Sequence, residues 1–88
     1  MVMDIHYSSR FRKQYKKLTE PIREKVQERV RIFLKNEFDP LLDNHPLQGK
    51  YIGCRSIDIT GNYRLIYERY PDGSLNFVAV GTHPQLYG

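Results

Sequence analysis

The sequence from Arg55 to Thr82, RSIDITGNYRLIYERYPDGSLNFVAVGT, contains three apolar runs separated by two short turns. Gly61-Asn62 separates the first two runs, and a glycine in a two-residue connection supplies the positive φ that a tight hairpin turn needs. Pro71-Asp72-Gly73 separates the second run from the third and is typical of a turn. Residues 55–60, 63–67 and 75–82 are therefore predicted to form an antiparallel meander.

Two consecutive helices are predicted upstream of this meander. In residues 8–18, Phe11, Tyr15 and Leu18 recur at the spacing of one helical face, and a serine precedes them as a cap. In residues 19–36, Pro21 falls in the first turn of the second helix, where its missing N–H costs nothing. The short connection between these helices predicts an antiparallel helical hairpin.

The remaining segments complete an α+β prediction. Residues 3–7 alternate as a short strand, and residues 37–53 hold the prolines and glycines of a loop. The predicted order is β-α-α-β-β-β in one domain, residues 1–88, with an antiparallel sheet packed on the N-terminal helical hairpin. The opposite face of the sheet is expected to be open to a ligand.

The positive charge is concentrated in the first part of the chain. Residues 1–36 hold ten Lys/Arg and four Asp/Glu, or +6, whereas residues 37–88 hold four and six, or −2, which gives the net +4. A basic half of this kind is typical of proteins that bind a polyanion or an acidic partner. A solvated helix face is the alternative interpretation of the same charges.

The cysteine and histidine content excludes several classes of protein. The single cysteine, Cys54, cannot form an internal disulfide, and the three histidines show no zinc-ligand spacing, so we expect no metal. No apolar run is long enough for a signal peptide or a membrane span. These features favour a cytoplasmic protein.

Four short motifs follow one another in the order of a known family: His45-Pro46-Leu47-Gln48-Gly49, Gly53-Cys54-Arg55, the strand 63–67 (YRLIY), and residues 81–87 (GTHPQLY). Together with the β-α-α beginning, this pattern resembles the YafQ-like branch of the RelE/ParE toxins over nearly the whole chain. The resemblance implies the RelE-like microbial ribonuclease fold. It also implies the toxin of a type II toxin–antitoxin system, blocked by an acidic, partly helical antitoxin.

The implied activity is cleavage of mRNA in the A site of the ribosome. In this family the RNA 2′-OH attacks the adjacent phosphate and leaves a 2′,3′-cyclic phosphate. Such a reaction needs a base, an acid and positive charge at the phosphate, but it needs no metal. Hence this chain is expected to be an endoribonuclease without a cofactor.

Two histidines match the family pattern. His83 matches the histidine of its Gly-Thr-His motif and is the first candidate for acid/base catalysis, because an imidazole titrates near neutral pH. His45 matches the histidine of the His-x-Leu-x-Gly segment and can supply a second imidazole, or alternatively bond the loop backbone. His6 matches no functional position.

Three cations and two tyrosines are further candidates. Arg55 is favoured for the scissile phosphate, and Arg64 comes second because a strand arginine can equally pair with a nearby carboxylate; Lys50 is a third, weaker candidate. Tyr87 matches the position where relatives carry an aromatic residue close to the scissile site; it can stack on a base or orient the sugar, or alternatively pack on the sheet. Tyr63 is assigned to RNA contact or, by a small margin, to the core.

The chain departs from the family pattern at two positions. Asp58 stands where the pattern usually has a histidine, and Asn62 stands where it usually has an aspartate. A carboxyl group with a pKa of about 3.9 can act as a base but is a poor acid at neutral pH, and an amide transfers no proton. Activity is therefore expected to be weakened, and a non-catalytic protein that binds an antitoxin or inhibits a topoisomerase in the manner of ParE is the alternative.

Overall fold

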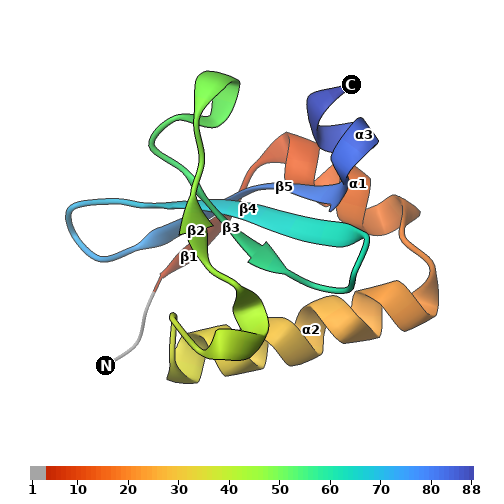
Figure 1. Ribbon diagram of the computed structural model, residues 1–88, viewed down its shortest axis with the longest axis horizontal. Coiled ribbons are helices and arrows are strands. Elements are labelled where there is room, and N and C mark those ends of the chain that lie inside the picture. The colour runs from red at the N-terminus through yellow and green to blue at the C-terminus, as the bar shows by residue number, and fades with distance from the viewer. Residues whose placement is uncertain (1–3) are drawn as a thin grey trace.

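The computed structural model describes residues 4–88 and contains five strands, three α-helices and two single 3₁₀ turns (Figure 1). Met3, included in the predicted first strand, lies outside these residues. The elements are, in order, β1 (Ile5–Tyr7), α1 (Ser9–Lys17), α2 (Glu20–Lys35), η1 (Pro40–Leu42), β2 (His45–Pro46), η2 (Gly49–Tyr51), β3 (Arg55–Asp58), β4 (Tyr63–Arg69), β5 (Leu75–Thr82) and α3 (His83–Tyr87).

The five strands form one sheet in the order β1-β5-β4-β3-β2. The predicted meander β3-β4-β5 is confirmed as antiparallel, and β2 extends it as a further antiparallel strand opposite Arg55 and Ser56. The fully antiparallel sheet is a wrong prediction at one edge, because β1 pairs in parallel with β5. Parallel neighbours need a long connection, and here the chain passes through the two helices and strands β2, β3 and β4 between β1 and β5.

Helix α1 continues the edge of β5 beyond the end of β1. Ser8 caps the helix by accepting a hydrogen bond from the backbone N–H of Phe11, at 2.9 Å. Its hydroxyl also donates to the carbonyl of Val78, at 2.7 Å, while the backbone N–H of Val80 donates to Gln14 Oε1, at 2.9 Å. Side chains thereby satisfy backbone groups that would otherwise remain unpaired at a sheet edge.

The main hydrophobic core lies between the sheet and the two long helices. Its buried members are Phe11, Val26, Phe33, Leu42, Ile57, Ile59, Leu65, Tyr67, Leu75, Phe77 and Val80. Phe33 of α2 contacts Tyr67 of the central strand edge to face, with ring centroids 4.8 Å apart. The predicted packing of the helical hairpin on one face of the sheet is confirmed by this set.

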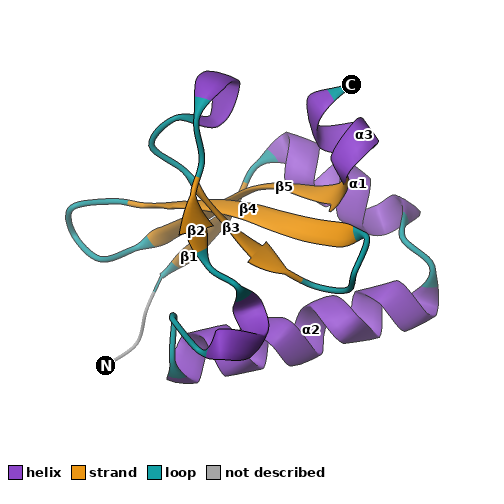
Figure 2. Ribbon diagram, viewed as in Figure 1, coloured by secondary structure: helices purple, strands orange, loops and turns teal. Residues whose placement is uncertain are grey.

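The opposite face of the sheet is partly covered. Figure 2 shows α2 on one side of the sheet, and η2 and α3 on the other. There Leu47, Tyr51 and Leu86 pack on Ile66 and Ala79 as a second, smaller core. The expectation of an open face is therefore wrong where η2 and α3 lie, and only the area beside these two elements can receive a ligand.

None of the helices within residues 4–88 has the length and apolar character required to span a membrane.

Candidate active site

A hollow of about 440 Å³ lies where the β3–β4 turn meets the junction of β5 and α3. It is lined by Gly61, Asn62, Tyr63, Arg64, Thr82, His83 and Pro84. The register of the sheet explains this meeting, because Tyr63 pairs with Thr82 and Arg64 pairs with Gly81. The turn after β3 and the end of β5 are thereby brought to the same end of the sheet.

His83 is the first residue of α3 and is exposed at this hollow. The backbone N–H of Thr82 donates to Gln85 Oε1, at 2.8 Å, which fixes the start of the helix. The imidazole stacks on the ring of Tyr87 one turn later, with centroids 4.6 Å apart and planes inclined by 28°. His83 is thus held in a defined orientation while its ring remains accessible.

Arg64 is the cation of the hollow. Its Nε lies 2.9 Å from Asp58 Oδ1, and its Nη1 donates to the carbonyls of Thr60, Gly61 and Tyr63 at 3.0 to 3.2 Å. These contacts fix the β3–β4 turn and orient the guanidinium. Within residues 4–88, Nη2 makes no hydrogen bond, so this nitrogen is left for a ligand.

Asp58 has an unusual environment for a carboxylate. Burial raises its pKa above the ordinary value and Asp43 adds to the rise, while Arg64, His45 and Arg29 act in the opposite direction. Oδ1 is buried and, although Arg64 Nε is close, receives no well-directed hydrogen bond from the described residues. The structure therefore makes Asp58 more readily protonated than the unperturbed carboxyl assumed from the sequence.

His45 lies at the far end of the same face. It is exposed in β2, pairs with Ser56, and has Nδ1 2.8 Å from the carbonyl oxygen of Asp43. Three strand spacings separate β2 from β5, or roughly 14 Å at about 4.8 Å per strand. His45 therefore contributes to the field at Asp58 but does not join His83 around one phosphate.

Arg55 is not brought to the hollow. It pairs with Tyr67 and, like Ile57, points to the helix side of the sheet. Its Nε donates to Asn44 Oδ1, at 2.7 Å, and its Cζ lies 5.2 Å from the centroid of the Phe38 ring. Strict alternation along β3 separates it from Asp58 and Arg64, so the sequence preference for Arg55 over Arg64 does not agree with the geometry.

The remaining candidates lie on two sides of His83. Tyr63 packs against the helix-side core and also lines the hollow. Lys50 is exposed in η2, with Nζ 5.9 Å from the centroid of Tyr87, whose side chain is 40% exposed. Burial, and then the neighbouring Tyr51, raises the pKa of Tyr87.

Tyr51 is a site residue that the sequence did not single out. It is buried, and its hydroxyl donates to the carbonyl of Leu86, at 2.7 Å, so that it fixes η2 to α3. Its ring also meets Tyr87 edge to face, with centroids 5.2 Å apart. The only sequence signal for its burial is the apolar residue Leu47 four positions earlier, a spacing that can place two side chains on the same face.

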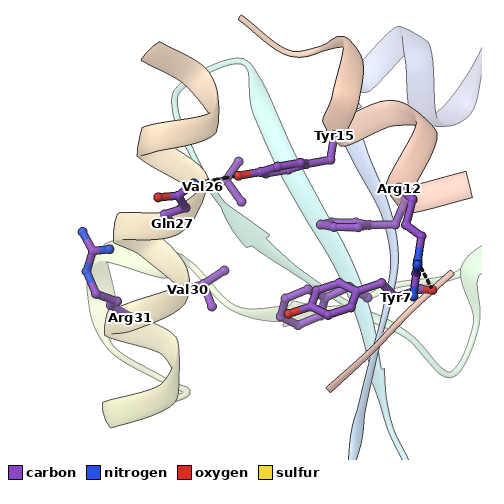
Figure 3. Close-up of a pocket in the computed structure, with 9 residues that line it drawn as sticks. Tyr7, Arg12, Tyr15, Val26, Gln27, Val30 and Arg31 are labelled. Carbon is purple, nitrogen blue, oxygen red and sulfur yellow. Dashed lines mark hydrogen bonds between the residues drawn. The ribbon is translucent and has the colours of Figure 1, made fainter. Parts of the chain in front are cut away.

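A larger hollow, of about 580 Å³, lies between α1 and α2 on the helix side (Figure 3). Its lining is mainly aromatic and aliphatic, and Arg12 and Arg31 are its charged members. Tyr15 accepts a hydrogen bond from Gln27 across it, at 2.8 Å. Because no acid/base pair lines this groove, proton transfer is better served by the hollow at His83.

The residues described offer no cluster of three metal-ligating side chains.

A five-stranded mixed sheet, with two helices between β1 and the other strands and an exposed histidine at the start of α3, is the fold of an α+β toxin of the RelE/ParE superfamily. A family model described as "Bacterial toxin of type II toxin-antitoxin system, YafQ" matches residues 3–88, and the chain belongs to this family. It is the toxin of a type II toxin–antitoxin system. The resemblance inferred from the four motifs is confirmed.

Solved structures agree with this assignment. YafQ from E. coli strain BL21(DE3) is 27% identical, with a TM-score of 0.82 over 99% of this chain and 100% of that one. YafQ in the E. coli DinJ–YafQ toxin–antitoxin complex is 28% identical, with a TM-score of 0.80 over 100% of both chains. The YoeB/ParE toxin from Agrobacterium tumefaciens, at 21% identity, shares the fold, with a TM-score of 0.76 over 92% of this chain and 99% of that one. A search of curated protein sequences gave no match.

Proposed function

We propose that this toxin is a metal-free endoribonuclease that cleaves mRNA in the ribosomal A site. The observation that carries the proposal is that His83 and Arg64 line the same hollow, one as a proton carrier and the other as a fixed positive charge. In the reaction the 2′-OH loses its proton and attacks phosphorus, and the 5′-oxygen leaves with a proton. The products are a 2′,3′-cyclic phosphate and a 5′-hydroxyl.

The proposed roles follow from the hollow. His83 transfers a proton, because it is exposed there and its ring is oriented by Tyr87. Arg64 stabilises the charge that develops on the phosphate through Nη2, while its other nitrogens remain bound to Asp58 and the turn. Lys50 and Tyr87 contact the adjoining RNA, and Tyr63 and Asn62 shape the wall of the hollow.

Asp58 is the proposed second proton-handling group. Its raised pKa makes it a better proton acceptor than an ordinary aspartate, and although it is not among the residues that line the hollow, it is in contact with Arg64, which is. His45 acts on Asp58 through its charge rather than by touching the phosphate. Arg55 serves to position the loop at Asn44 instead of binding RNA.

An acidic antitoxin is the proposed inhibitory partner. The E. coli relative is found in a DinJ–YafQ complex, and the +6 of residues 1–36 gives this toxin a surface that attracts carboxylates. Since mRNA and ribosomes are the proposed substrates, the toxin acts in the cytoplasm.

Primer extension on mRNA from a translation reaction tests the proposal. The wild type is expected to give a new 5′ end in the A-site codon, and His83→Ala is expected to lose it at unchanged thermal stability. His6→Ala is the matched control, because His6 is an exposed histidine of β1 that pairs with Asn76 near the start of β5, whereas His83 follows the end of that strand. Undiminished cleavage by His83→Ala removes this histidine from the reaction.

A supercoiling assay on the same samples distinguishes the nuclease from the ParE-like alternative, in which the toxin inhibits a topoisomerase. Inhibition of supercoiling by the wild type, with no new mRNA end in the presence of ribosomes, contradicts the proposed nuclease. The absence of both effects contradicts it as well and leaves a toxin fold that binds other proteins.

A further inference from the structure

A chain of three aromatic rings begins at the candidate active site and ends beside α1. His83 stacks on Tyr87 with centroids 4.6 Å apart, and Tyr87 meets Tyr51 with centroids 5.2 Å apart. The first two residues of this chain are exposed, whereas Tyr51 is 5% exposed and forms its floor. A nucleotide next to the hollow therefore meets a ring surface rather than water alone.

Two cations flank the inner end of this ring chain. Lys50 Nζ lies 5.3 Å from the centroid of Tyr51, and Arg10 Cζ lies 5.6 Å from the same centroid. Lys50 comes from η2 and Arg10 from α1, so the two charges meet through folding rather than through sequence proximity. We call Arg10, Lys50, Tyr51 and Tyr87 the cationic–aromatic patch.

These cations are not used for internal pairing. Arg64 and Arg69 each have a carboxylate partner, at 2.9 and 2.8 Å. By contrast, within residues 4–88 neither Arg10 nor Lys50 forms an ion pair, and both are exposed. Their charges lie beside the Tyr51 ring and are not neutralised by a carboxylate of the described residues.

The patch is also held in place before any ligand arrives. The hydroxyl of Tyr51 donates to the carbonyl of Leu86, which fixes η2 to α3, and both residues are buried in the smaller core. Because the rings and charges are already arranged, less conformational entropy is lost on binding.

We propose that this patch binds the nucleotide adjoining the scissile phosphate, with Arg10 and Lys50 on its phosphate and Tyr87 against its base. Single-stranded RNA fits this combination, because exposed cations attract phosphates and an unpaired base can stack on an exposed ring. An acidic protein segment would pair with the two cations but has no planar base to stack on the exposed ring of Tyr87. The assignment of RNA rests on the proposed nuclease function and adds α1 to its substrate-binding surface.

A binding assay that needs no catalysis tests the proposal. The probe is a fluorescein-labelled 2′-O-methyl oligouridine, which has no 2′-OH to attack, and anisotropy is measured with the full chain over a series of salt concentrations. Arg10→Ala is expected to bind several-fold more weakly and to reduce the slope of log affinity against log salt by about 0.7, the value for one phosphate contact in single strands. Lys50→Ala is expected to behave in the same way, and Arg10→Lys is expected to restore the slope.

Arg12→Ala is the matched control. Arg12 is also an exposed arginine of α1, but its Nε donates to the carbonyl of Tyr7 and its side chain lines the groove between α1 and α2. Arg12→Ala removes the same charge as Arg10→Ala but at a position outside the patch, so the salt slope of this variant is expected to remain that of the wild type. Tyr87→Leu is expected to weaken binding while leaving the slope unchanged, since it removes a ring and no charge.

The experiments distinguish a failure of the RNA-binding patch from a failure of the proposed nuclease function. If Arg10→Ala and Arg12→Ala lower the slope equally, or if neither does, the patch is not a specific RNA contact, even when the wild type cleaves mRNA. If Arg10→Ala leaves RNA affinity intact but loses affinity for poly-L-glutamate, the patch binds a protein partner and the RNA assignment is wrong. A wild type that binds the probe through Arg10 but cuts no mRNA contradicts only the nuclease.

Discussion

The hydroxyl of Tyr67 donates a hydrogen bond to Glu37 Oε2, at 2.5 Å, and joins the middle of β4 to the segment that follows α2. The same hydroxyl accepts a hydrogen bond from Asn44, at 2.8 Å, and Arg69 binds the other oxygen of Glu37, at 2.8 Å. Asn44 in turn holds Arg55. A fully buried tyrosine thus organises the loop between the helices and the sheet.

Tyr67→Phe is expected to lower the free energy of unfolding by about 1–2 kcal/mol. The ring and its contact with Phe33 remain, while Glu37 and Asn44 each lose a partner inside a partly buried network. Urea denaturation measures the change. Tyr70→Phe is the control, because its hydroxyl meets Glu68 at the exposed surface. Equal effects of the two substitutions would contradict a structural role for the buried network.

The wild type is expected to lose stability at alkaline pH through Tyr67. Burial, followed by the hydrogen bond to Glu37, raises its pKa from 10.0 to about 12. The folded state therefore holds this proton more tightly than the unfolded chain does. The contribution of protonated Tyr67 to the free energy of unfolding is complete below pH 10 and is lost as the pH rises toward about 12. The stability difference between the wild type and Tyr67→Phe should shrink over this interval when urea denaturation is repeated across it.

Asp58 and Asp72 are expected to affect stability with opposite dependence on pH. Burial raises the pKa of Asp58, so ionisation above its ordinary pKa of 3.8 costs stability, and Asp58→Asn should gain relative to the wild type as the pH rises. Hydrogen bonds from the Ser74 side chain and backbone lower the pKa of Asp72, so its contribution is present above 3.8 and is lost as the pH falls. Denaturation midpoints of Asp58→Asn and Asp72→Asn, followed from acid to neutral pH, should diverge from the wild type in opposite directions. Parallel curves would contradict the environment assigned to Asp58.

Gly81→Ala is expected to destabilise the start of α3. A Cβ at this position would lie 2.8 Å from Gln85 Oε1, the acceptor of the Thr82 backbone N–H, and would displace it. The loss of such a cap costs about 1 kcal/mol. Gln85→Ala removes the same bond, so the double variant should lose clearly less than the sum of the two single losses. Additive losses in urea denaturation would show that the added methyl group acts elsewhere.

Much of this fold was predictable because its main signals are local. The alternation in residues 55–82 predicted the meander, and the stripe of Phe11 and Tyr15 predicted the first helix. The two-residue turn with a positive φ at Gly61 was a wrong prediction, because residues 59–62 all lie between β3 and β4 and Gly61 has no positive φ, whereas Gly73 has one. The α3 helix was missed, although Thr82-His83-Pro84-Gln85 has the Ser/Thr-x-x-Gln spacing of a capping box and a proline in the first turn.

The contacts that depend on distant segments were the harder part. The parallel pairing of Ile5 with Leu75 has no local signal in either segment. The proximity of Arg64 to His83 follows from the β4–β5 register, which no local pattern predicts. The helix-side position of Arg55 follows from its sharing a strand face with Ile57, which the alternation of residues 55–58 does predict.

The parallel pairing of β1 with β5 determines when this toxin can be assembled. Tyr7 pairs with Phe77, and the Ser8 hydroxyl donates to the carbonyl of Val78. The N-terminal strand therefore cannot pair until about seventy further residues have been translated. The histidine at position 83 is made later still. A nascent chain of this protein therefore cannot acquire its finished surface early in synthesis.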